Sequence, residues 1–188
     1  MSTIAGLVPN VVGVSVNVLG GDRLRLSNYS DKNVVILGYE GEPYLRFTRS
    51  GVFENIRSPA AYLNRFRYPA GVAPEAADAA APPEWRRVRP GVSFEWHDHR
   101  IHWTGKRPPR AVDESRDKAH LIFNWRVPGR ADGKAFAITG FLGYVPRPGA
   151  RKTQHGWVVP TTGAALGAAA LAALWVGMGA RRRQRRAP

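Results

Sequence analysis

Apolar and polar residues alternate through most of the first half of the chain. Valines occupy every even position from 12 to 18, and a second alternating stretch at Leu24 and Leu26 follows the turn Gly20-Gly21-Asp22. A period of two predicts strands with one buried face, and the glycine-rich turn predicts a hairpin. We expect further strands at 44–47, 92–97, 101–104, 120–127 and 134–145, and a buried apolar run at 34–37.

Strands that recur about every ten residues favour an all-β domain. We therefore predict a mostly β domain over residues 1–149, built as an immunoglobulin-like antiparallel β-sandwich; the C-terminal features described next predict that this domain is extracytoplasmic. Residues 58–90 interrupt the pattern with alanines and prolines, so we expect a long surface connection there, with a short helix around Pro74 to Ala81. A charged, proline-containing loop is expected at 106–117.

The stretch from Trp157 to Ala180 contains no ionisable side chain. Its last eighteen residues, as a helix, would span about 27 Å, close to the hydrocarbon thickness of a bilayer. Five arginines follow, and such clusters stay on the cytoplasmic side of a membrane. We therefore expect a juxtamembrane linker at 150–156, one transmembrane helix at 157–180 in the lipid bilayer and an Arg-rich cytoplasmic tail at 181–188.

The formal net charge of +14 divides equally between the two parts of the chain. Residues 151–188 carry seven basic and no acidic side chains, and the first 150 residues carry 21 basic and 14 acidic ones. The domain is thus moderately basic, which favours anionic headgroups or wall polymers but is not by itself a sign of nucleic-acid binding. Cysteine is absent, which excludes thiolate chemistry and Cys-ligated zinc.

Residues 1–20 lack the basic start and the uninterrupted apolar core of a signal peptide. A domain outside the membrane must nevertheless be exported. Two explanations stay open: an upstream start that carries the signal, or insertion through the C-terminal helix alone.

Three of the five histidines lie in the octapeptide 96–103, Trp-His-Asp-His-Arg-Ile-His-Trp. On a strand, His97 and His99 project from one face about 7 Å apart, and His102 can join them if the chain turns. Imidazoles without thiolates suit Cu(II) or Zn(II), so these three are the candidate metal ligands. The alternative is a structural corner in which the histidines are hydrogen-bonded and the two tryptophans are core. A further ligand is expected from among His120, Glu95 and Asp98.

The cluster also carries the first half of a cupin signature, since five residues separate Gly91 from His97. The glutamate that should follow is absent, and Pro146 does not begin the expected second half, so a cupin enzyme is excluded. Nucleophile elbows, phosphate-binding loops and dinucleotide fingerprints are absent as well. The adjacent Asp113 and Glu114 are interpreted as solvated loop residues, and no catalytic residue is predicted.

A second motif precedes the apolar stretch. Val159-Pro160-Thr161-Thr162-Gly163 resembles a sortase sorting signal, whose usual pentapeptide begins with leucine. The resemblance implies cleavage between Thr162 and Gly163 and attachment to the cell wall. The other interpretation is a proline-capped start of an ordinary membrane helix.

Five strings in the domain resemble a group of uncharacterised single-pass membrane proteins of actinobacteria, the high-GC Gram-positive bacteria. The resemblance covers roughly Gly38 to Trp103 and the C-terminal anchor, and it implies a location in the cell envelope without any known activity or residue role. The strings are GYEGEPYLRF, GVFEN, RSPAAYLN, PPEWRRV and WHDHRIHW.

Taken together, these features predict a non-enzymatic, membrane-anchored envelope protein that acts as an interaction or accessory module. Its partner would be another envelope protein or an anionic wall polymer, not nucleic acid. The first alternative is an extracytoplasmic copper or zinc binder that uses His97, His99 and His102. The second is a sortase-processed wall protein.

Overall fold

The computed structural model describes residues 1–68 and 71–147. Among these residues, no helix has the length and apolar character needed to cross a membrane. The predicted linker, transmembrane helix, arginine tail and sorting-like motif all lie outside the described residues.

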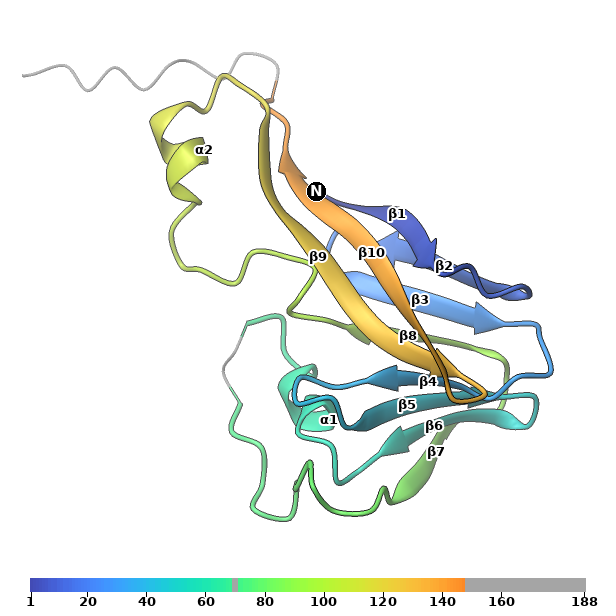
Figure 1. Ribbon diagram of the computed structural model, residues 1–188. Helices are drawn as coiled ribbons and strands as arrows, with labels where there is room; N and C mark the ends of the chain where they lie inside the picture. Colours follow the sequence, from blue (N-terminus) through green and yellow to red (C-terminus); the bar gives the residue numbers. More distant parts are fainter. Residues whose placement is uncertain (69–70, 148–188) are drawn as a thin grey trace, which may run out of the picture. The chain divides into compact units, whose positions relative to one another are not determined.

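Two antiparallel sheets form the domain, so the mostly β, sandwich-like architecture predicted from the sequence is confirmed (Figure 1). The larger sheet has the strand order β1-β10-β9-β4-β5-β6-β7, and the smaller has the order β2-β3-β8. The strands are β1 (Ser2–Val8), β2 (Val14–Leu19), β3 (Arg23–Asn28), β4 (Val34–Leu37), β5 (Pro43–Thr48), β6 (Gly51–Asn55), β7 (Trp85–Arg89), β8 (Ser93–His97), β9 (His120–Ala131) and β10 (Lys134–Tyr144). Two short helices are present, α1 (Ala60–Leu63) and α2 (Arg110–Glu114).

The core lies between the inner faces of the two sheets. Leu24, Leu26 and Trp96 project from the smaller sheet and are buried, as are Phe47 and Ile36 from the larger one. The rings of Phe47 and Trp96 have their centroids 6.1 Å apart, so the sheets are in direct side-chain contact. The period-two alternation therefore places its apolar residues where the sequence predicts them.

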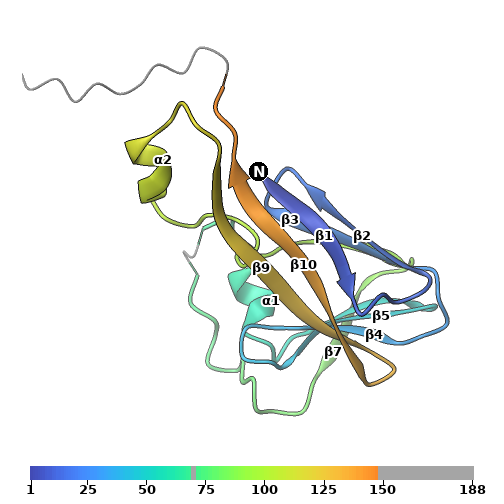
Figure 2. The same ribbon diagram turned by 45° about the horizontal axis from the view of Figure 1, so that its top comes forward.

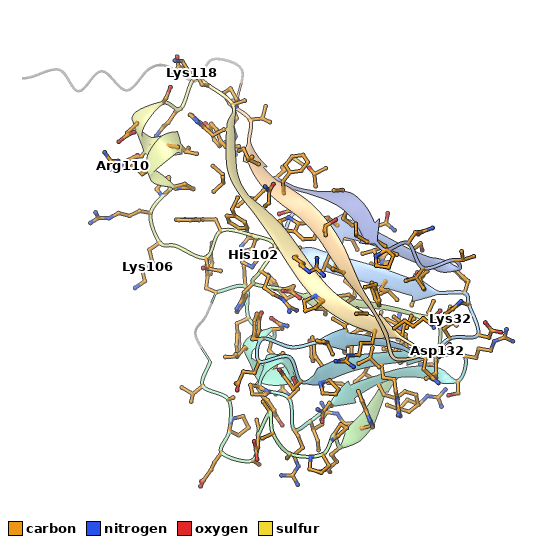
Figure 3. All side chains as sticks on the ribbon, in the orientation of Figure 1. Lys32, His102, Lys106, Arg110, Lys118 and Asp132 are labelled. Carbon is orange, nitrogen blue, oxygen red and sulfur yellow. The ribbon has the colours of Figure 1, made fainter. Side chains whose placement is uncertain are left out.

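A long hairpin of β9 and β10 extends beyond the strands of the sheet (Figures 1 and 2). Asp132 and Gly133 form its two-residue turn with positive φ angles of 45° and 79°, as Asp-Gly does in tight hairpins. The Asp132 N–H donates to the Asn33 carbonyl at 3.0 Å, and Asp132 Oδ1 accepts the Asn33 N–H at 2.9 Å. Figure 3 labels Asp132 beside Lys32 at this junction of two loops.

Several local predictions were wrong. Residues 101–104 form no strand, because the chain turns there, and the charged loop at 106–117 contains α2. The connection at 58–90 contains α1 and ends in strand β7, which pairs with β6. No helix forms at 74–81, where isolated turns occur instead.

Strand β1 was not predicted from the sequence. It pairs with β10, but a bulge between Ile4 and Gly6 shifts its register. Gly6 has a φ angle of 153°, and the irregularity disrupts the alternation by which a strand is recognised.

The two sides of the sandwich differ. At one side, the edge strands β1 and β2 contact each other. At the other side, β7 ends the larger sheet and β8 ends the smaller one, and each pairs with a single neighbour within residues 1–68 and 71–147. On this side β6 contacts β8 without pairing with it, and Ala61, Asn64 and Arg65 line a cavity together with Trp96 and His97.

Gly140 is predicted to be intolerant of any side chain. A Cβ at this position would lie 2.1 Å from the Thr3 carbonyl oxygen of β1 and 2.2 Å from the Trp125 ring. Because a backbone atom cannot rotate away, Gly140→Ala should lower the free energy of unfolding by about 3 kcal/mol. The matched control is Gly91→Ala, since its Cβ would meet no atom within 4 Å. Urea unfolding followed by tryptophan fluorescence compares the two, and equal stabilities would contradict the predicted packing.

Candidate functional site

A tight turn directly after β8 carries the predicted histidines. The Ile101 N–H donates to the Asp98 carbonyl at 3.2 Å, so the chain reverses within four residues. Ile101 is completely buried and fixes the turn against the core. Figure 3 labels His102 at the opposite end of the strands from Lys32 and Asp132.

A buried ion pair organises this turn. Asp98 is 0% exposed, and its carboxylate accepts the Arg100 side chain at 2.8 and 2.7 Å, together with the indole N–H of Trp96 at 3.1 Å. Arg100 Nη1 also donates to the carbonyls of Leu37 and Gly38, at the end of β4. The pair thus ties the end of the smaller sheet to the larger one, and its hydrogen bonds satisfy the buried charge.

The turn brings the rings of His97, His99 and His102 together. Their centroids are 5.0 Å apart for His97 and His102, 5.6 Å for His99 and His102, and 5.8 Å for His97 and His99. Three imidazoles around one tetrahedral zinc ion would have centroids about 5 Å apart, given a metal–nitrogen distance of about 2 Å. The turn therefore makes the three rings neighbours, with centroids 5.0 to 5.8 Å apart.

Two ring nitrogens in this cluster are buried without a partner. Within the described residues, Nε2 of His97 and Nε2 of His102 have no hydrogen bond. His102 Nδ1 lies 3.1 Å from the Trp103 carbonyl oxygen, so this nitrogen carries the proton if the ring is neutral. The lone pair of His102 is then on Nε2, the nitrogen that has no hydrogen bond within the described residues.

Asp22 is a fourth member of the site that sequence reasoning missed. It is 7% exposed, and its Oδ2 lies 3.6 Å from His97 Nε2. The antiparallel pairing of β3 with β8 places it here, since the Asp98 N–H donates to the Asp22 carbonyl at 3.3 Å. Only the register of two strands far apart in sequence could have revealed it.

The segment after α1 covers the cluster. The carboxylate of Asp22 accepts a hydrogen bond from Arg67, and His99 Nε2 lies 2.7 Å from the carbonyl oxygen of Phe66. Two potential metal donors are thus engaged within the chain. Accordingly, no group of three or more His, Cys, Asp or Glu side chains among the described residues is arranged to hold a metal ion.

Tyr39 forms the floor under His99. The two rings are stacked with centroids 6.3 Å apart, and the Tyr39 hydroxyl accepts the His99 backbone N–H at 3.1 Å and donates to Asn64. Burial and the nearby Asp98 charge raise the pKa of Tyr39, so the hydroxyl keeps its proton at neutral pH. The uncharged Tyr39 hydroxyl therefore both accepts and donates a hydrogen bond, and it fixes the position of the His99 backbone.

The other proposed ligands do not join the cluster. Asp98 forms its ion pair with Arg100, and Glu95 forms ion pairs with Arg23 at 3.0 Å and Arg25 at 3.1 Å. His120 lies on β9, where its Nε2 is 2.6 Å from the Ser115 carbonyl oxygen.

Asp113 and Glu114 were expected to be solvated loop residues. They lie on α2 and are exposed there, in ion pairs with Arg116 and Arg110.

Comparison of the chain with protein-family models, with curated proteins and with solved structures finds no match in any of the three. The function must therefore be argued from the site itself.

Removing the Asp98 carboxylate should destabilise the whole domain. Asp98→Ala leaves the Arg100 guanidinium buried and unpaired, which should lower the free energy of unfolding by about 3–5 kcal/mol. Asp113→Ala, which breaks the exposed pair with Arg116, should change it by about 0.5 kcal/mol or less. Urea unfolding measures both, and a small effect at Asp98 would contradict its organising role.

Acid should destabilise the fold through the histidine cluster. Burial lowers the pKa of both His97 and His102 below the ordinary value of 6.5, and the other histidines of the cluster add to the effect. Below about pH 6.5 these two histidines therefore bind protons more readily in the unfolded chain than in the folded one. The free energy of unfolding should accordingly be highest above about pH 6.5 and fall as the pH drops below it. Unfolding in urea and EDTA at about pH 7.5 and 5.5 tests this. The acid-induced loss should shrink in His97→Asn/His102→Asn, and an unchanged loss would contradict the assignment.

Proposed function

We propose that this chain is a non-enzymatic metal-binding module that takes up one divalent transition-metal ion, copper or zinc, at the histidine cluster. The observation that carries the proposal is that His97 and His102, whose rings are 5.0 Å apart, each have a buried Nε2 atom without a hydrogen bond. A buried polar atom without a partner costs about 1–3 kcal/mol. A shared metal ion would satisfy both nitrogens at once.

The protonation of His102 supports this assignment. Histidines that ligate metals commonly donate their second ring N–H to a carbonyl, which orients the ring and leaves the other nitrogen free to bind. His102 has this arrangement, with the Trp103 carbonyl as the acceptor at 3.1 Å. The lowered pKa of His97 and His102 also favours the neutral form that a metal requires.

Asp22 and His99 complete the proposed donor set. Asp22 Oδ2 is 3.6 Å from the free nitrogen of His97, and the His99 ring lies within 6 Å of both other rings. Metal binding would have to compete with Arg67 for Asp22 and with the Phe66 carbonyl for His99. The Arg67 side chain is 54% exposed, so water can replace Asp22 as its partner.

An imidazole set with one carboxylate and no thiolate favours Zn(II) or Cu(II) over Cu(I). The cluster offers no separate acid–base pair for turnover, because Asp98 and Glu95 are both neutralised by arginines. This supports a binding role over an enzymatic one.

The location remains part of the proposal. The apolar stretch at 157–180 and the arginines that follow it support a membrane tether with the domain outside the cytoplasm. The immunoglobulin-like class of the sandwich and the processing of Val159–Gly163 likewise stay predictions.

Metal titration of the full chain, purified without a polyhistidine tag, tests the metal proposal. We expect one Zn(II) or Cu(II) ion per chain with a sub-micromolar dissociation constant in calorimetry. His97→Ala/His102→Ala should weaken binding by about 100-fold or more, because both free donors are lost.

The matched control is His120→Ala, a histidine outside the cluster, which should bind metal like the wild type. Circular dichroism confirms that each variant is folded. Equal affinity in the double variant, or no stoichiometric binding by the wild type, would refute the metal site.

A further inference from the structure

The free edge of β8 offers unpaired backbone groups. The Asn28 N–H donates to the Val92 carbonyl at 2.9 Å, and the Asp98 N–H donates to the Asp22 carbonyl at 3.3 Å. Antiparallel strands alternate between bonded and non-bonded pairs, so even-numbered residues of β8 point their backbone groups at β3. Ser93, Glu95 and His97 therefore point theirs away from β3. In the described part of the chain, β8 pairs with no other strand.

A groove runs along this edge. Two adjoining cavities, of about 380 and 230 Å³, share Phe94 and Glu95 in their walls. The larger reaches Ser93, with Val88 and Arg89 of β7 opposite, and the smaller reaches His97. Together they follow β8 over its full length, about 17 Å for five extended residues.

Arginines dominate the charge of the groove. Arg23, Arg25, Arg65 and Arg89 line it, against Glu54 and Glu95. Both glutamates are already paired, Glu95 with Arg23 and Arg25, and Glu54 with Arg86 at 2.7 Å. Among the described residues, Arg89 has no ion pair, so the groove keeps an excess of positive charge.

We propose that this groove binds an extended acidic segment of another polypeptide, which adds as a strand to the free edge of β8. The unpaired groups of Ser93, Glu95 and His97 would supply the backbone hydrogen bonds, as in other cases of strand addition. The arginines select acidic side chains. This inference goes beyond metal binding and is tested without metal.

The test uses fluorescence anisotropy of the full chain in EDTA with a fluorescein-labelled octapeptide of alternating valine and aspartate. We expect saturable binding that weakens with salt, because the arginine contacts are exposed. Replacing aspartate by lysine in the peptide should weaken binding by about tenfold or more. N-methylation of every second amide should do the same, because those donors pair with the strand edge.

Matched variants of the chain locate the site. Ser93→Pro removes an N–H that faces the free edge, where proline is tolerated in a sheet, and Ser93→Ala keeps it. Both lose the hydrogen bond between the Ser93 and Ser27 hydroxyls, so only the proline variant should lose peptide binding. Arg25→Glu/Arg89→Glu should also weaken it.

Three outcomes would overturn the proposal: no binding by the wild type, equal binding of the lysine peptide, or undiminished binding of the N-methylated peptide. The last would mean that charge alone holds the ligand, as for an anionic wall polymer. If Ser93→Pro fails to fold, the N-methylated peptide still decides the question with the wild-type chain.

Discussion

The buried ion pair between Asp98 and Arg100 is the interaction on which the rest of the site depends. The carboxylate is completely buried, and it is stabilised by the Arg100 guanidinium, the Trp96 indole and the Arg100 backbone N–H. The arginine in turn donates to the carbonyls at the end of β4. One pair thus closes the turn after β8 and joins the two sheets. A buried pair of this kind contributes little net stability, but it permits few alternative arrangements of the chain around it.

That rigid corner explains why three histidines can be close without being bonded to one another. Backbone interactions set their positions: Tyr39 holds the His99 N–H, and the Trp103 carbonyl orients the His102 ring. Two ring nitrogens of this cluster, Nε2 of His97 and Nε2 of His102, are buried without a hydrogen bond in the described residues. Apolar side chains in place of His97 and His102 would avoid this cost, since buried polar atoms without hydrogen bonds lower the free energy of unfolding. The cost is understandable if the nitrogens bind a ligand.

Features that depend on neighbouring residues, such as most strands and the histidine spacing, could be predicted from the sequence. Contacts between residues far apart in the sequence could not. Alternation identified β2, β3, β5, β8, β9 and β10, and a run of four apolar residues identified β4. The spacing of His97, His99 and His102 indicated that one turn could bring them together. Asp22 was missed because it is 75 positions from His97 in sequence and meets it only through the register of β3 and β8. Strand β1 escaped because of its bulge at Gly6, and 101–104 was mistaken for a strand because its apolar residues fix a corner.

His97 belongs to both proposed sites, and this has a thermodynamic consequence. Its side chain faces His102 and Asp22, while its backbone N–H and carbonyl lie on the free edge of β8. A strand that paired with this edge would restrain the residue that offers a free nitrogen to the metal. If binding at one site changes the position or freedom of His97, linkage requires that each ligand alter the affinity of the other by the same factor.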